Sequence, residues 1–237
     1  MSGLRVLVIT PTYNERENLP AFVSAVRKVL PDADILVVDD ASPDGTGILA
    51  EGLAATDSRL IVLHRPAKQG LGRAYRAAFR VAFARGYDRV IQMDTDFSHD
   101  PKDLPRLLAA AESADLVIGS RYSQGGVRVL NWPLRRLFLS YGAGLYVRLL
   151  TRLPVMDPTA GYKCFRRETL ASILQGPIAA EGYAFQVETT YHAWRAGFRI
   201  VEIPIVFADR VAGRSKMSLS IAWEAIRLVL RLAIRHR

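Results

Sequence analysis

Residues 34–46 carry the sequence DILVVDDASPDGT, which decides the fold class. The aliphatic run at its start ends at Asp39 and Asp40, and the Ser, Pro, Asp and Gly residues that follow favour a turn and the start of a helix. Taken alone, the segment is a strand followed by a turn and an N-cap. Similar strand-like runs lie at 4–10, 60–64 and 89–94, and each ends at polar or turn residues.

Helical patterns separate these strands. Apolar residues recur at the spacing of one helical face over 19–30, and Leu71, Tyr75, Phe79 and Phe83 repeat every four residues. Strands that alternate with helices predict an α/β fold with a Rossmann-like, mostly parallel sheet flanked by helices. In such sheets, ligands bind beyond the carboxyl ends of the strands.

The second half of the chain has fewer strands and longer helices. It contains helical patterns at 133–151, 182–195 and 217–236 and strand patterns at 115–120 and 199–207. With no internal repeat and no Pro/Gly-rich linker, we expect a single domain over residues 1–237. The longest charge-free apolar stretch, 137–147, is well below the roughly 20 residues that span a bilayer, so we expect no transmembrane helix.

Charge divides the chain at Ser120. Residues 1–120 hold 14 Lys and Arg against 16 Asp and Glu, whereas 121–237 hold 18 against 7, a net charge of +11. The basic excess predicts an anionic partner for the second half: nucleic acid, acidic lipid or a phosphorylated acceptor. We do not expect nucleic acid, because the basic residues are not interleaved with stacking aromatics in any RNA-binding motif.

The cysteine count and the first residues bear on the compartment. Cys164 is the single cysteine, so no internal disulfide forms, and its apolar, strand-like surroundings predict a core residue. The apolar run at 4–10 is too short for a signal peptide. We therefore expect a reducing, cytoplasmic location.

The strongest chemical motif is Asp94-Thr95-Asp96, at the end of the fourth strand. Its two carboxylates converge on one divalent cation if the backbone turns there, and such hard oxygen ligands suit Mg²⁺ or Mn²⁺. Acidic loops are also common on solvated surfaces, but Asp39-Asp40 supplies a second acidic strand end in the same sheet. No dinucleotide-binding G-x-G-x-x-G and no P-loop occur, which excludes the usual dehydrogenase and P-loop nucleotidase patterns.

Short motifs stand at 11–15 (PTYNE), 37–46 (VVDDASPDGT), 93–99 (MDTDFSH), 119–122 (GSRY) and 209–216 (DRVAGRSK). In this order they resemble the motifs of the dolichol-phosphate mannose synthases, which are inverting family 2 glycosyltransferases with a GT-A fold. The resemblance covers about residues 4–218. Its acidic elements are common to the wider family, whereas the last motif and Phe-Ser-His at 97–99 are specific to a smaller group within it. Without paired C-terminal membrane spans, the chain resembles the short form of the family.

The resemblance implies that residues 1–120 bind the nucleotide sugar and the metal. Pro11, Tyr13, Glu15, Asp40, Asp44, Asp94 and Gln186 would form the donor site. Asp94 and Asp96 would hold Mg²⁺ or Mn²⁺, with Ser98, or water in its place, as the third ligand. His99 is expected to brace this loop by hydrogen bonding rather than to bind the metal.

In the resembled family, Asp157 corresponds to an aspartate near the sugar, and the resemblance makes it a candidate catalytic residue together with Asp96 and Arg121. A turn-initiating Asp before Pro158 is the alternative. The helix that would place Gln186 at the site also carries Glu188. A position on a solvated helix face explains Glu188 nearly as well as a position at the active site.

Residues 121–237 would bind the acceptor and face the membrane. A phosphate monoester is mostly ionised near neutral pH because its second pKa is about 6, so the site needs cations rather than a strong general base. The acceptor-phosphate candidates are Arg121, Arg135, Arg136, Arg210 and Lys216; for each, a solvated surface charge is the alternative. The sequence does not decide which of Arg135 and Arg136 points inward.

The final helix has two interpretations. Arg227, Arg231 and Arg235 fall four apart on one face, and apolar residues cover much of the rest. This pattern suits a helix at the headgroup boundary of an anionic bilayer, but also a closing helix packed on the sheet.

The resemblance implies a mannosyltransferase that moves mannose from GDP-mannose to polyprenyl phosphate with inversion, and the basic second half leads us to expect peripheral binding to the cytoplasmic face of a membrane. The alternatives are a polyprenyl-phosphate glucosyltransferase that uses UDP-glucose, another family 2 glycosyltransferase, or a catalytically silent scaffold that binds nucleotide sugars.

Overall fold

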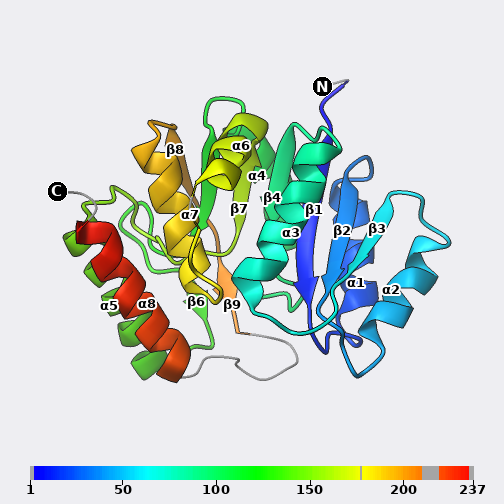
Figure 1. Ribbon diagram of the computed structural model, residues 1–237, viewed down its shortest axis with the longest axis horizontal. Helices are drawn as coiled ribbons and strands as arrows, with labels where there is room; N and C mark the ends of the chain where they lie inside the picture. The colour runs from blue at the N-terminus through cyan, green and yellow to red at the C-terminus, as the bar shows by residue number, and fades with distance from the viewer. Residues whose placement is uncertain (1–2, 177, 210–218, 235–237) are drawn as a thin grey trace.

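The computed structural model describes residues 3–176, 178–209 and 219–234, which form helices on both faces of a central sheet (Figure 1). The first half comprises β1 (Val6–Thr12), α1 (Leu19–Val29), β2 (Asp34–Asp39), α2 (Thr46–Ala54), β3 (Leu60–His64), α3 (Leu71–Ala84), β4 (Arg89–Gln92), the 3₁₀ turn η1 (Pro101–Asp103), α4 (Leu104–Ala110) and β5 (Leu116–Ser120). The second half comprises β6 (Val129–Leu130), α5 (Leu134–Thr151), β7 (Lys163–Arg166), α6 (Arg167–Gln175), α7 (Ala184–Arg195), β8 (Ile200–Pro204), β9 (Phe207–Ala208) and α8 (Leu219–Ile234).

The main sheet has seven strands in the order β3-β2-β1-β4-β7-β5-β8. All neighbouring pairs are parallel except those of β7, which is antiparallel to both β4 and β5. This confirms the predicted α/β fold with a mostly parallel, mixed sheet. Because β1, β2 and β4 are parallel, their carboxyl ends meet at one edge and bring the predicted acidic strand ends together.

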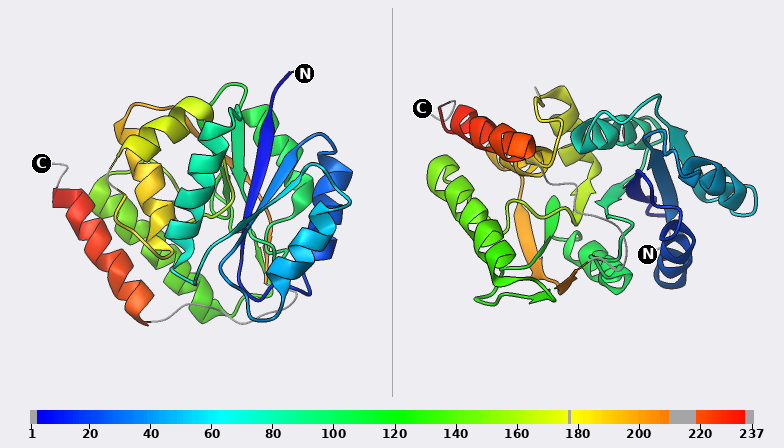
Figure 2. Two further views of the ribbon diagram at one scale, coloured as in Figure 1. Left: turned by 45° about the vertical axis from the view of Figure 1, so that its right-hand side comes forward. Right: turned by 90° about the horizontal axis from the view of Figure 1, so that it is seen from below.

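Each face of the sheet has its own core. Alternate residues of β1 separate the two sides, with Leu7 and Ile9 in one cluster and Val8 in the other. The first cluster includes buried residues of α3, α6, α7 and α8, and the second includes buried residues of α1, α2 and α4. Figure 2 shows this division of the helices between the two faces.

The predicted strand at 199–207 forms two separate strands. Pro204, which has no backbone N–H to donate, ends β8, and the chain leaves the main sheet there. Phe207 and Ala208 then pair with β6 in a parallel ladder of their own. This small sheet carries the chain back toward the end of β4, where the Ala208 amide donates to the Ser98 carbonyl at 3.2 Å.

The last helix, α8, packs against α7 and α5 at the end of the molecule opposite β3 (Figure 1). Leu228, Val229 and Leu232 bury its inner face. Its outer face and that of α5 expose large apolar side chains: Leu134, Phe138, Leu139, Leu145, Leu149, Trp223, Ile226, Leu230 and Ile234. No helix within the described residues is long and apolar enough to span a bilayer.

Candidate active site

A cleft of about 350 Å³ opens at the carboxyl ends of β1, β2 and β4. One side is lined by Pro11, Thr12, Tyr13, Glu15, Asp40, Asp94, Thr95 and Asp96, and the other by Lys68 to Leu71, Ala74, Glu181 to Tyr183 and Glu224. Most of the residues predicted to bind the nucleotide sugar therefore lie in one cleft. Asp44 and Gln186 do not line it.

The two aspartates at the end of β2 have different surroundings. Asp39 accepts hydrogen bonds from the Thr12 hydroxyl at 3.1 Å and from the amide and hydroxyl of Ser42 at 3.1 and 2.5 Å, so it braces the turn. Asp40 lines the cleft and pairs with Arg65. Burial raises the pKa of Asp40, although the Arg65 guanidinium opposes the rise. Asp40 is therefore the carboxylate that is placed to meet a ligand.

Asp44 supports the cleft from behind. It accepts from the hydroxyl and amide of Thr46 at 2.6 and 3.0 Å and from the Arg16 amide at 3.2 Å. Burial alone raises the pKa of Asp44, but these hydrogen bonds lower it. The carboxylate thus joins the first turn of α2 to the loop that carries Tyr13 and Glu15, and it is not among the residues that line the cleft.

Asp96 is largely buried and lines the cleft, and its Oδ1 accepts hydrogen bonds from the Ser98 amide at 3.1 Å and the Ser98 hydroxyl at 2.6 Å. The Ser98 side chain, predicted as a third metal ligand, therefore directs its hydroxyl hydrogen at Asp96 and fixes that carboxylate. Within the described part of the chain, no group of three or more His, Cys, Asp or Glu side chains could hold a metal ion.

Polar side chains form a buried layer behind Asp94. Gly161 lies between them: a Cβ built there would stand 3.9 Å from Asp94 Oδ2, 3.7 Å from His99 Cε1 and 3.6 Å from Gln186 Nε2. The Gln186 Oε1 is buried without a hydrogen-bond partner among the described residues. These are ordinary van der Waals distances, so Gly161 lies directly between the Asp-x-Asp loop and Gln186.

His99 was predicted to brace its loop by hydrogen bonding, but in the structure its imidazole is buried against aromatic rings. Its ring lies 4.9 Å from the Tyr162 ring and 5.1 Å from the Phe207 ring, and its Nδ1 has no partner in the described chain. Burial lowers the pKa of His99 to about 4, so the imidazole is neutral at pH 7.

Arg121 and Asp157 form a buried, two-pronged ion pair. The Arg121 Nε lies 2.7 Å from Asp157 Oδ2 and one terminal nitrogen lies 2.6 Å from Oδ1, while the Arg121 amide also donates to Oδ2 at 2.9 Å. Burial alone lowers the pKa of Arg121, but the facing carboxylate raises it. Because each group satisfies the other, the pair holds the loop before β7 against the end of β5.

The structure separates the two adjacent arginines of α5. Arg135 is exposed, whereas Arg136 is half-buried, with its guanidinium carbon 4.1 Å from the centre of the Trp132 ring. An Arg136 terminal nitrogen lies 2.7 Å from Asp209 Oδ1. Arg136 therefore faces the segment that begins the DRVAGRSK motif. Arg210 and Lys216, also predicted to bind the acceptor phosphate, lie outside the described residues.

The far side of the cleft includes residues 181–183, the last part of the segment 178–183, which we name the donor wall. Its Ala179 and Ala180 amides donate to the Glu188 carboxylate at distances of 2.8 to 3.0 Å. Burial raises the pKa of Glu188, but His192 and these amides lower it. Glu188 is therefore not a solvated side chain, the alternative considered from its sequence; it is buried and fixes the donor wall.

The Gly70-Leu71-Gly72 segment, which forms no dinucleotide motif, allows α3 to approach the donor wall. A Cβ at Gly70 would lie 2.4 Å from the Glu181 carbonyl oxygen, and one at Gly72 would lie 2.5 Å from that of Ala180. The Gly72 amide donates to the Glu181 carbonyl at 2.7 Å. Glycine is needed here because any side chain would collide with backbone.

Lys163, which the sequence did not single out, is fully buried at the start of β7. Its Nζ donates to the Gln186 carbonyl at 2.6 Å, and burial lowers the pKa of Lys163 to about 7 against the opposing effect of Asp157. The signal available in the sequence was a lysine directly before Cys164 and Phe165, at the start of a short strand-like run.

This depressed pKa predicts a pH-dependent stability. Between pH 7 and the ordinary lysine pKa of 10.5, the unfolded chain binds more protons than the folded one, so the free energy of unfolding should rise with pH. Relative to Lys163→Met, the wild type should gain up to about 1.4 kcal/mol per pH unit above pH 7. Urea unfolding of both proteins at pH 7, 8 and 9 measures the difference. If the free energy of unfolding changed with pH equally in the two proteins, Lys163 would already be charged in the folded state.

Solved glycosyltransferase structures share this fold. Glucosyl-3-phosphoglycerate synthase from Mycobacterium tuberculosis, in complex with Mn²⁺, UDP and glucosyl-3-phosphoglycerate, superposes with a TM-score of 0.69 at 20% identity, over 99% of this chain and 80% of that one. A mannosyltransferase from Pyrobaculum calidifontis, in complex with GDP-Man and Mn²⁺, superposes with a TM-score of 0.59 at 19% identity, over 99% and 74%. The chain therefore has the GT-A fold.

Two relatives are similar over nearly the whole sequence. The undecaprenyl-phosphate mannosyltransferase of Micrococcus luteus is 50% identical over 99% of this chain and 96% of its own. The polyprenol monophosphomannose synthase of Mycolicibacterium smegmatis is 51% identical over 98% of this chain and 88% of its own. The glycosyl transferase family 2 model matches residues 7–174, which include β1, both acidic strand ends and the Arg121–Asp157 pair. The chain thus belongs to glycosyl transferase family 2.

Proposed function

We propose that the chain transfers mannose from GDP-mannose to a polyprenyl phosphate and inverts the configuration at the anomeric carbon. The observation that carries this proposal is that about half of all residues are identical to those of two relatives, over nearly the whole length of each. The names of these relatives specify a mannosyltransferase and a polyprenol phosphate product or acceptor. The cleft supports it with Pro11, Tyr13, Glu15 and Asp40 placed along one side for the nucleoside.

The donor set of the cleft fits a divalent cation. Two aspartates follow β4 and line the cleft, and Mg²⁺ or Mn²⁺ is commonly held by one or two carboxylates together with substrate phosphates. Asp94 and Asp96 would hold the ion, and the donor diphosphate and water would complete its shell. When bound, such an ion offsets the negative charge on the departing diphosphate.

The chain's own residues orient the acceptor. A phosphate monoester is largely ionised near neutral pH, so its oxygen can attack in line without a strong general base. Arg136 is our choice for the acceptor phosphate, because Trp132 and Asp209 direct it toward the motif at 209–216. Arg210 and Lys216 belong to the same proposed site. We assign Arg121 and Asp157 a positioning role beside the sugar, since their ion pair is buried, whereas the Arg136–Asp209 pair is partly exposed and open to an acceptor.

The test of this function is a panel of labelled sugar nucleotides with a short-chain polyprenyl phosphate. GDP-mannose should be the preferred donor, and Arg136→Ala should raise the KM for the acceptor about tenfold or more, while the KM for the donor stays constant. Arg135→Ala, one residue away and exposed, is the matched control. Preference for UDP-glucose would replace the proposed donor, and a donor-side defect in Arg136→Ala would refute the acceptor assignment.

We propose further that α5 and α8 dock on the cytoplasmic face of an anionic membrane. Both helices expose apolar residues, such as Phe138 and Trp223, and α8 also exposes Arg227 and Arg231, the combination expected at a headgroup boundary. Arg235, the third member of the predicted stripe, lies outside the described residues. The inner face of α8 is packed against the rest of the protein. The same helix is therefore also a closing helix, and membrane docking is proposed for its exposed side only.

Docking of this kind predicts salt-sensitive binding to vesicles. Each basic residue near the surface contributes about 1 kcal/mol, and the attraction decays within a Debye length. The protein should float with vesicles that contain acidic lipid at low salt and be released at high salt, and Arg227→Ala with Arg231→Ala should weaken flotation. Flotation that ignores both salt and the substitutions would count against the electrostatic part of the proposal.

A further inference from the structure

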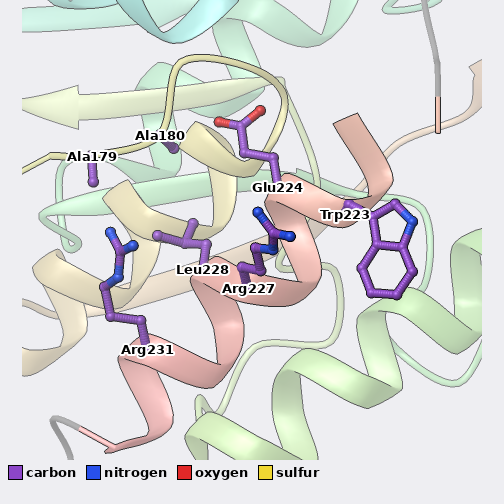
Figure 3. A pocket seen from close by; sticks show the side chains of 7 residues that line it. All are labelled: Ala179, Ala180, Trp223, Glu224, Arg227, Leu228 and Arg231. Atoms are coloured by element: carbon purple, nitrogen blue, oxygen red, sulfur yellow. The ribbon is translucent and has the colours of Figure 1, made fainter. Parts of the chain in front are cut away.

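A second cavity, of about 500 Å³, lies on the outer side of the donor wall. Figure 3 shows its lining: Ala179 and Ala180 from the donor wall, and Trp223, Glu224, Arg227, Leu228 and Arg231 from α8. Glu224 also lines the candidate active-site cleft. This side chain therefore stands between the outer helix and the donor side of the cleft.

Glu224 makes close contact with the donor wall. Its Oε1 accepts hydrogen bonds from the amides of Glu181 at 2.8 Å and Gly182 at 3.1 Å. A Cβ at Gly182 would lie 2.6 Å from Glu224 Oε2, so a side chain at that position would displace the carboxylate. Figure 3 shows Glu224 directed from α8 toward this segment.

The consecutive amides from Ala179 to Gly182 are thus held by two carboxylates on different helices. Glu188, on α7, accepts from the first two, and Glu224, on α8, accepts from the last two. Glu188 belongs to a buried helix of the core, whereas Glu224 belongs to a helix whose outer face is exposed. The half of the donor wall nearest Tyr183 is therefore held by α8 through its amides, in addition to the Gly72 hydrogen bond from α3 to the Glu181 carbonyl.

We propose that Glu224 is a positioning residue of the donor cleft, through which α8 holds Glu181 and Gly182 in the conformation that binds a nucleotide sugar. This role of Glu224 rests on the proposed function only in the identity of the nucleotide sugar that binds. Its consequence is reciprocal: whatever fixes α8 from outside favours donor binding, and a bound donor favours the docked position of α8.

Hydrogen exchange of the protein without ligand tests the tether itself. In Glu224→Ala, the amides of Glu181 and Gly182 should exchange about tenfold faster, whereas those of Ala179 and Ala180, held by Glu188, should keep the wild-type rate. Glu224→Gln retains an accepting oxygen and should stay close to wild type. Tyr191→Phe is the matched control, because the Tyr191 hydroxyl donates to the Leu232 carbonyl of α8 at 3.2 Å and makes no hydrogen bond to the donor wall within the described residues.

Binding of GDP-mannose with Mn²⁺, measured by calorimetry, tests the consequence. Glu224→Ala should raise the Kd about tenfold, Glu224→Gln should restore it to within about twofold, and Tyr191→Phe should leave it unchanged. Two results would overturn the proposal. One is the same change in exchange rate, relative to wild type, at all four amides of Glu224→Ala; the other is the same change in Kd in Glu224→Ala and Tyr191→Phe. If the wild type bound no GDP-mannose, the donor assignment would fail, and the exchange rates would still decide the role of Glu224.

Discussion

Asp96→Ala is expected to abolish sugar transfer while leaving the fold intact. The carboxylate lies in the cleft at the end of β4, and the Ser98 amide and hydroxyl fix its orientation. Loss of a charge that helps to hold a cation against a departing diphosphate costs several kcal/mol, which corresponds to a loss in kcat of about a thousandfold or more. Transfer assays with GDP-mannose, before and after addition of a chelator and of Mn²⁺ or Mg²⁺, measure this effect.

Two comparisons separate charge from loop structure in this experiment. Asp96→Asn keeps an oxygen that can accept the Ser98 hydrogen bonds but removes the charge, so its activity should fall nearly as far. Asp32→Ala removes a carboxylate whose side chain is 95% exposed and should behave as wild type. Full activity in excess chelator, or an active Asp96→Asn variant, would rule out a metal-assisted reaction at this site.

Asp157→Ala should destabilise the protein by about 3–5 kcal/mol, because it leaves the Arg121 guanidinium buried without its partner. The Asp157 side chain is fully buried and that of Arg121 is only 10% exposed, so water cannot replace the lost carboxylate. Urea unfolding should show the loss as a lower midpoint with an unchanged slope. Activity should also fall, since the loop between α5 and β7 loses its anchor on β5.

The double variant Arg121→Met with Asp157→Leu provides the decisive control. Removal of both charges leaves neither group uncompensated, so the double variant should be more stable than Asp157→Ala. It should nevertheless remain inactive if the pair positions the sugar. A double variant as unstable as the single one would show that the loss comes from packing around Met156 and Pro158 rather than from an unpaired charge.

The sequence was sufficient to predict the sheet edge that carries the site. Alternating strands and helices require a right-handed, mostly parallel arrangement, so aspartates at the ends of β2 and β4 had to share one edge. The same logic does not give the direction of β7, because a strand's local pattern is identical whether it runs parallel or antiparallel. Cys164 was correctly predicted to lie in a core strand, but the reversal of that strand could not be predicted.

Pairings between distant residues were also beyond the sequence. Arg121 and Asp157 were both proposed as active-site groups, yet nothing local shows that they satisfy one another across 36 positions. Arg135 and Arg136 are equivalent in sequence, and the contacts of Arg136 with Trp132 and Asp209 distinguish them. Glu224 lies in a helix whose pattern indicates amphipathicity, so its contact with the donor wall had no sequence signal.

The burial of Cys164 makes the protein convenient for chemical labelling. The thiol is fully buried in β7 between β4 and β5, and burial raises its pKa to about 12, so almost none of it is thiolate at neutral pH. A cysteine introduced at an exposed position of α8 would therefore be the one that maleimide reagents modify in the folded protein, without prior removal of the native thiol. Slow modification of Cys164 itself would report the transient separation of the strands at the centre of the sheet.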